Sequence, residues 1–343
     1  MPNVNTRNDV VRPMNVVVAR GSPAETHFRS LAALPGAARP DTEALATGLK
    51  RTPRHNLKFH GGKTIRDLSF TNLYLGGASS WDAADIKKID HALAAAMSDK
   101  NLNNMMMQYF ANQPIGSTFK ASQVLSGAKP AQFSQGDVVL LIEQLHAQGK
   151  LNGLNLDATV INLLLPRGTV LTTDAAPTHA ELRAAPANPT RPESEDTSLQ
   201  GLGGYHGSVH VKNKVTVYYA VGVYSERSTH GGENGIVAFD HPWKNIVATF
   251  YHELCEARTD ADVEDAIRAG NDPNGVKFLG WMSTQGEECG DFPMFEVGPD
   301  LGLVMQEVPL ADGSGTVPVQ FQYSNAVAGP EGPIPAPHKK PAH

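Results

Sequence analysis

Two apolar runs constrain the fold of this chain more than any other feature of its sequence. Residues 158–165 (ATVINLLL) are almost continuously apolar and end at Pro166, and residues 215–224 (VTVYYAVGVY) form a second run. Runs of this kind are typical of strands that are buried on both faces. A chain of 343 residues is long enough to supply helices that cover such strands.

Amphipathic segments alternate with these runs. The helical spacing of apolar residues predicts helices over residues 81–97, 134–148 and 243–257, and Ser80 is a suitable N-cap for the first of them. Residues 68–75 (LSFTNLYL) alternate and predict a further strand. Strands interleaved with helices indicate an α/β or α+β domain with a mixed sheet.

Segments rich in proline and polar residues divide the chain. Residues 1–55 are expected to be a flexible arm or a propeptide, and residues 56–325 a single domain. Residues 173–200 are expected to form a proline-rich surface insertion in that domain, and residues 326–343 a disordered proline-rich tail.

Composition excludes several classes of protein. The net charge of −6 argues against a nucleic-acid partner, because phosphate contacts need clustered lysine and arginine. No apolar run is long enough to span a membrane, and the run at residues 14–19 is shorter than the apolar region of a usual signal peptide. Cys255 and Cys289 are the only cysteines, so the chain is not a disulfide scaffold, although one bridge between them stays open.

The segment His252-Glu253-Leu254-Cys255-Glu256 lies within the predicted helix 243–257. Residues four apart lie on one face of a helix, so His252 and Glu256 point the same way, as two metal ligands must. In zinc peptidases with the HExxH motif, the residue at the position of Glu253 acts as the general base. Zinc is the expected metal, with manganese or calcium as alternatives, because glutamate replaces the second histidine.

A catalytic metal also needs a third protein ligand and an open position. Glu288 and Asp291, in the acidic segment 286–291, are the leading candidates, and Asp260 and Asp262 compete with them. His206 is a further candidate ligand, and His206, Tyr205 and Tyr251 are candidates for stabilising an oxyanion.

Ordinary structural roles compete with each assignment. HExxE has only three fixed positions and arises by chance on exposed helices. Glu288 and Asp291 taken alone suit a solvated turn, and His206 taken alone suits a structural histidine. His60 suits a turn, and Cys255 a small buried thiol.

Several motifs together resemble the phosphate-induced, EXORDIUM-like proteins. The resemblance runs over residues 59–293 and comprises Phe59-His60-Gly61-Gly62, Gly204-Tyr205-His206, the 252–256 motif, Gly280-Trp281 and Glu288-Cys289-Gly290-Asp291. Pro293 stands where that family usually has cysteine. The resemblance implies a secreted or cell-surface protein, although no leader is evident here. It implies no established reaction.

The sequence therefore predicts one zincin-like metallohydrolase domain. His252, Glu256, and Glu288 or Asp291 would bind zinc, Glu253 would be the general base, and a peptide or protein would be the substrate. The alternative is a non-catalytic EXORDIUM-like binding or cell-surface protein with a structural metal site. The oligomeric state is not predicted.

Overall fold

The computed structural model of the chain describes residues 15–19, 21–26, 41–44, 46, 48–173, 197–227, 232–270, 272–297 and 300–342. Most of the predicted insertion, residues 174–196, lies outside the described residues, as does much of the predicted N-terminal arm.

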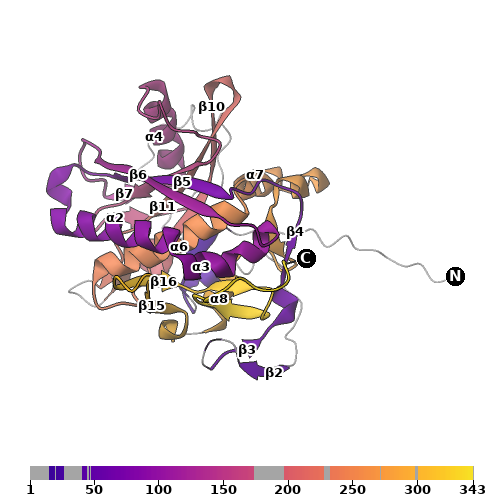
Figure 1. Cartoon of the computed structure of the whole chain (residues 1–343). Coiled ribbons are helices and arrows are strands. Elements are labelled where there is room, and N and C mark those ends of the chain that lie inside the picture. Colours follow the sequence, from indigo (N-terminus) through magenta and orange to yellow (C-terminus); the bar gives the residue numbers. More distant parts are fainter. Residues whose placement is uncertain are drawn as a thin grey trace.

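A six-stranded mixed sheet forms the centre of the molecule (Figure 1). Its strand order is β1 (Val16–Val18), β10 (Leu202–Val211), β11 (Val215–Gly222), β8 (Thr159–Leu164), β5 (Asp67–Tyr74) and β6 (Gly116–Val124). Strands β11, β8, β5 and β6 are parallel, whereas β10 is antiparallel to both of its neighbours. The predicted α/β class with a mixed sheet is confirmed.

Helices cover both faces of this sheet. Helices α2 (Ala83–Ser98), α3 (Lys100–Met106) and α6 (Pro242–Thr259) pack on one face, and α4 (Gln135–Ala147) packs on the other (Figure 1). Alternate residues of β8 enter the two cores: Val160 faces α2 and α6, whereas Ile161 faces α4. Every residue of β8 is buried for this reason, as its apolar run predicts.

The ends of the helices follow local capping chemistry. Ser134 caps α4 in a capping box with Asp137, which also accepts the Ser134 backbone N–H. The N-cap of helix α2 is Asp82, two residues beyond the predicted cap, because the Asp82 carboxylate accepts the Ala84 N–H, whereas Ser80 donates its hydroxyl to the Gly76 carbonyl. Pro242 occupies the first turn of α6, where a missing N–H costs nothing.

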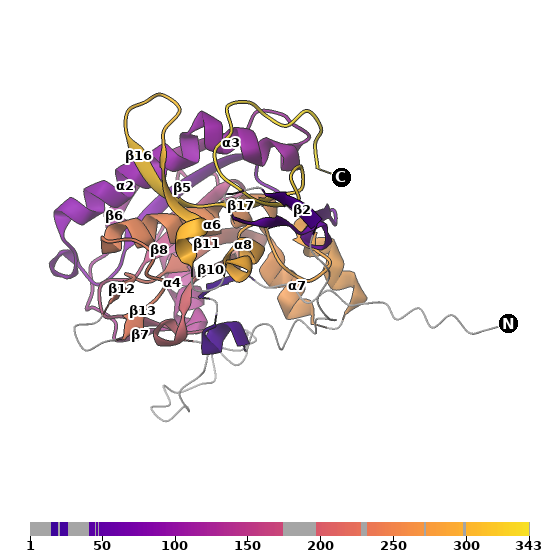
Figure 2. The same cartoon turned by 90° about the horizontal axis from the view of Figure 1, so that it is seen from below.

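In the part of the chain that the structure describes, six two-stranded sheets and two short helices surround this centre. They are β2 (Asp41–Ala44) with β3 (Lys50–Arg51), β4 (Leu57–Phe59) with β14 (Trp281–Ser283), β7 (Gln132–Phe133) with β9 (Val170–Leu171), β12 (Glu226–Arg227) with β13 (Glu233–Asn234), β15 (Met305–Pro309) with β16 (Thr316–Gln320), β17 (Gln322–Ser324) with β18 (Gly329–Glu331), and the helices α7 (Val263–Ala269) and α8 (Asp291–Glu296). Strand β16 packs against α6, and α8 lies beside that helix (Figure 2).

Strands lie in both segments that flank the predicted domain. The apolar run near the N-terminus supplies β1, whose residues 16–18 pair with β10 and are buried. In the predicted tail, β18 pairs with β17, and the Ala342 N–H donates to Gln108. Proline restricts the unfolded chain, so ordering a proline-rich segment costs less entropy than ordering a flexible one. Among the described residues, no helix is both long and apolar enough to span a bilayer.

Candidate metal centre

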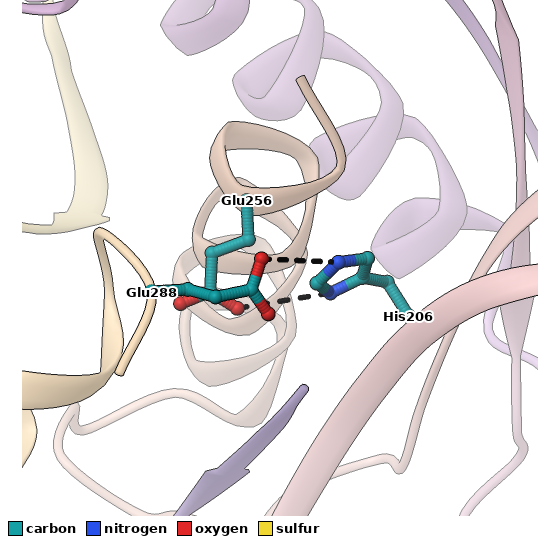
Figure 3. Close-up of side chains that lie close together, drawn as sticks. All are labelled: His206, Glu256 and Glu288. Carbon is teal, nitrogen blue, oxygen red and sulfur yellow. Dashed lines mark ion pairs between the residues drawn. The ribbon is translucent and has the colours of Figure 1, made fainter. Parts of the chain in front are cut away.

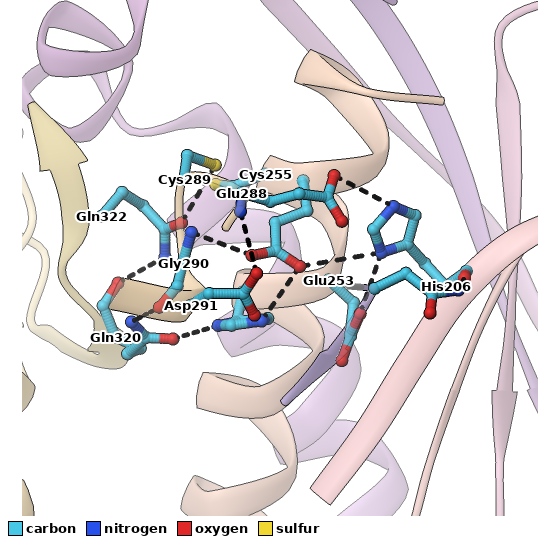
Figure 4. Close-up of polar contacts among 12 residues, drawn as sticks. His206, Glu253, Cys255, Glu288, Cys289, Gly290, Asp291, Gln320 and Gln322 are labelled. Atoms are coloured by element: carbon cyan, nitrogen blue, oxygen red, sulfur yellow. Dashed lines mark hydrogen bonds and ion pairs between the residues drawn. The ribbon is translucent and has the colours of Figure 1, made fainter. Parts of the chain in front are cut away.

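Four segments that are distant in sequence meet at one buried cluster of acids and histidines. Helix α6 supplies His252, Glu253 and Glu256, and β10 supplies His206. Glu288 and Asp291 come from the start of α8 and the loop before it, and Gln320 comes from the end of β16 (Figure 4). Each of these side chains is at most 1% exposed.

Helical geometry places two of the predicted ligands together. His252 and Glu256 are one turn apart on α6, and His252 Nε2 lies 3.0 Å from Glu256 Oε2. The second carboxylate oxygen of Glu256 accepts a hydrogen bond of 2.9 Å from the Gly290 N–H, which ties the acidic loop to the helix. Oε2 of Glu256, in contrast, has no hydrogen-bond partner.

The acidic loop has its own internal hydrogen bond. The Glu288 N–H donates to Asp291 Oδ2 over 2.8 Å, whereas Oδ1 of Asp291 has no hydrogen-bond partner. Gly290 lies so close to α6 that an added Cβ would collide with the His252 ring and stand 2.9 Å from Glu256 Oε1. Glycine at this position is what lets the loop approach the helix.

Two sets of three residues have ligand atoms that all lie within 4.8 Å of one another. One set is His252, Glu256 and Asp291, and the other is His206, Glu256 and Glu288 (Figure 3). Buried His, Glu and Asp groups of this kind could hold a metal ion. Glu256 belongs to both sets.

Gln320 determines which nitrogen of His252 faces the cluster. The Gln320 amide Nε2 donates to two backbone carbonyls, those of Gly290 and Phe321, at 2.8 Å each. Its oxygen Oε1 is therefore the atom that meets His252 Nδ1 and accepts a hydrogen bond from it. In a neutral His252, the bare electron pair then lies on Nε2, toward Glu256, as a metal ligand requires.

Several buried polar atoms of this cluster have no hydrogen-bond partner. They are His252 Nε2, Glu253 Oε1, Glu256 Oε2, Asp260 Oδ2, Asp291 Oδ1 and both carboxylate oxygens of Glu288. Leaving one such group buried and unsatisfied costs on the order of 1–3 kcal/mol, and more for a charged one. A cation placed among unsatisfied acceptors that face one another could satisfy several of them at once.

Burial and mutual repulsion raise the carboxyl pKa values in the cluster. Burial, reinforced by the charge of Glu256, holds the pKa values of Glu288 and Asp291 well above the ordinary range. Burial also raises the pKa of Glu253, to about 8. Burial lowers the pKa of His252, but Glu256 and Asp291 outweigh it, so the net direction is upward. In the metal-free cluster protons thus take the place of cationic charge, and metal binding would release them.

Glu253 and His206 form a contact of their own. His206 Nδ1 lies 3.2 Å from Glu253 Oε2, and its Nε2 lies 3.4 Å from the Asp260 carbonyl and 3.5 Å from Glu288 Oε1. The ring therefore stands between the acids of α6 and the acidic loop (Figure 4).

Other residues singled out in the sequence lie away from this cluster. The Tyr205 side chain lies on the opposite face of the sheet. There its hydroxyl donates to the Thr172 carbonyl and its ring packs edge-on against Tyr219. Neighbouring residues of a strand point to opposite faces, so Tyr205 and His206 cannot both face α6. Asp260 lies closer, but its Oδ1 accepts the Gly280 N–H, and it belongs to neither set of ligands.

The remaining candidates have structural contacts. Asp262 lies at the start of α7, and His60 contacts the Met282 carbonyl at 3.4 Å. Tyr251 is buried in the apolar core. Cys255 and Cys289 are both buried free thiols, and burial raises both of their pKa values.

Sequence reasoning missed Gln320. Its strand, β16, reads as an ordinary short strand, and a glutamine there carries no signal of a contact with α6. Gly290 belongs to a motif identified in the sequence, but its close approach to His252 depends on the fold.

Comparison of the chain with models of known families, with curated proteins and with solved structures finds no match.

Proposed function

We propose that this protein is a metal-dependent hydrolase that cleaves a peptide or protein substrate. One observation carries the proposal: the acids of the 288–291 loop converge on His252 and Glu256, and unpartnered buried ligand atoms face one another there. Zinc is the metal that best fits imidazole and carboxylate ligands in a site of few residues, with manganese as the alternative.

A bound metal would supply a water molecule whose pKa is lowered toward about 7. His252, Glu256 and Asp291 would hold the metal, with Gln320 keeping Nε2 of His252 free to bind it. Glu253 is the residue next to the first ligand histidine, as in HExxH peptidases. Its Oε1 has no partner, and this oxygen would accept the proton of the water.

A second candidate function is a structural metal site in a non-catalytic binding protein. Complete burial of the ligands favours it, because structural sites are closed whereas catalytic sites keep one position open. The two candidates differ in what Glu253 does, since a structural site gives its carboxylate no reaction to support.

Replacement of Glu253 by glutamine separates the two candidates. We expect Glu253→Gln to bind as much zinc as the wild type and to lose turnover by at least about 100-fold, the lower range for loss of a general base. Metal content by elemental analysis and cleavage of a peptide library by mass spectrometry would measure the two properties.

Glu287→Gln is the matched control. Glu287 is a buried glutamate of the same loop, but it contacts Ser283 and His55 rather than the cluster. The control should keep both zinc and turnover. Equal turnover by the wild type and Glu253→Gln would contradict the role of Glu253 as general base. If neither protein cleaves a peptide although zinc is bound, the structural site is favoured.

A further inference from the structure

We propose that the cluster binds two divalent cations, and that Glu256 bridges them through Oε2. This inference rests on the metal binding in the proposed function, but it does not depend on hydrolysis. Two-metal sites hold their ions about 3.5–4 Å apart, a separation that a shared carboxylate spans.

The first position is the set of His252, Glu256 and Asp291. His252 Nε2 and Glu256 Oε2 are 3.0 Å apart and form an ion pair only when His252 is protonated. Neither atom has a hydrogen-bond partner otherwise, and Oδ1 of Asp291 is also unpartnered. One cation among these three atoms would satisfy all of them. Asp291 Oδ2 and Glu256 Oε1 are held by backbone N–H groups, and the other oxygen of each side chain has no hydrogen bond.

That first cation leaves Glu288 unsatisfied. Both of its carboxylate oxygens are buried without a hydrogen-bond partner, and Glu288 groups with His206 and Glu256 rather than with His252. His206 Nε2 can donate its proton to the Asp260 carbonyl, and in that tautomer the bare pair lies on Nδ1. That atom lies 3.7 Å from Glu256 Oε2. Glu256 Oε2 thus stands between two histidine nitrogens.

Charge balance also favours two cations in the cluster. Glu253, Glu256, Asp260, Glu288 and Asp291 put five carboxylates in one buried region. Among the described residues, the buried arginine nearest in sequence, Arg258, turns away and donates to Gly116 and Asn103. With all five carboxylates ionised, one divalent cation would leave three of the negative charges without compensation, whereas two would leave one. Burial makes each uncompensated charge costly.

Metal stoichiometry tests this inference directly. The full chain is stripped with a chelator, dialysed against Mn²⁺ or Zn²⁺, and analysed for bound metal. We expect two ions per chain, and a spin-coupled signal for the Mn²⁺ form in electron paramagnetic resonance rather than the six-line signal of an isolated ion. Glu288→Gln should keep one ion and give the isolated-ion signal.

Matched variants locate the ions. Asp291→Asn should lose the ion of the first position, and Glu287→Gln, which lies outside the cluster, should keep both. One ion in the wild type would overturn the two-cation inference and leave metal binding intact, whereas no bound ion would remove the proposed function as well. Two ions retained in both Glu288→Gln and Asp291→Asn would place them elsewhere and also overturn the inference. If a variant fails to fold, the metal content and the spectrum of the wild type still test the inference.

Discussion

Gln320 shows how a neutral side chain can prepare a charged site. Its amide group is fixed by two backbone carbonyls, and this leaves its oxygen with only one role, that of an acceptor for His252 Nδ1. Partners of ligand histidines orient the ring and select the nitrogen that binds metal. Gln320 would therefore act on a bound metal through His252, as a positioning residue.

Replacement of Gln320 by leucine should weaken metal binding. The variant keeps much of the side-chain volume but removes the acceptor that orients His252, so we expect a loss of zinc affinity of about 10–100-fold. Competition with a chromophoric chelator would measure it. Gln322→Leu is the control, because Gln322 is also buried but contacts Cys289 and the Gln320 carbonyl instead of a ligand. Equal losses in both variants would contradict the role of Gln320.

Strand β10 connects the cluster to the rest of the sheet. Gly204 lies under α6, where an added Cβ would stand 3.1 Å from Glu253 Oε1 and 3.2 Å from Thr249 Cγ2. The absence of a side chain lets α6 lie close to the strand, and His206 then reaches Glu253 from the same face. Near its other end, β10 contacts α7 through His210, whose Nε2 lies 2.8 Å from Asp265 Oδ1.

The His210 contact with α7 should depend on pH. The hydrogen bond to Asp265 raises the pKa of His210 above its ordinary value, and the charge of Arg268 opposes it. A raised pKa in the folded state means that the contact stabilises the fold fully below the unfolded-state value of about 6.5. That stabilisation is lost as the pH rises through the folded-state pKa.

We therefore expect His210→Gln to lower the free energy of unfolding more at about pH 5.5 than at about pH 9, on either side of the histidine range. Urea denaturation at the two pH values would measure the difference. His91→Gln, at an exposed histidine of α2, serves as the control. A loss for His210→Gln that is the same at both pH values would show that the contact does not depend on its charge.

In the whole molecule, the cluster lies where α6, on one face of the central sheet, meets the C-terminal strands and the loop before α8 (Figure 2). Metal binding would join these segments, since Glu288 and Asp291 have few other contacts that hold their carboxylates in place. The uncompensated acids should also make the metal-free fold less stable than the metal-bound one.

Removal of metal should lower the melting temperature. A cation that binds only the folded chain stabilises it by about 2.7 kcal/mol at a concentration 100 times its Kd. We expect a chelator to lower the melting temperature, and added Zn²⁺ to restore it in a concentration-dependent way. Differential scanning calorimetry of the full chain would show both effects. The same melting temperature with chelator and with excess Zn²⁺ would argue against a metal centre.

Local sequence alone was enough to predict β8 and β11 from their apolar runs, and α4 and α6 from the 3.6-residue spacing of their apolar residues. It also placed His252 and Glu256 on one face of α6. The choice of partners required the tertiary structure. Contacts between segments far apart in the chain decide which acid approaches the helix. They also decide that His206 rather than Tyr205 faces it, and that Gln320 orients His252. The same is true of β1 and β18, whose pairing depends on strands elsewhere. No pattern in a single segment records such pairing, because the energy that selects it comes from burial against other segments.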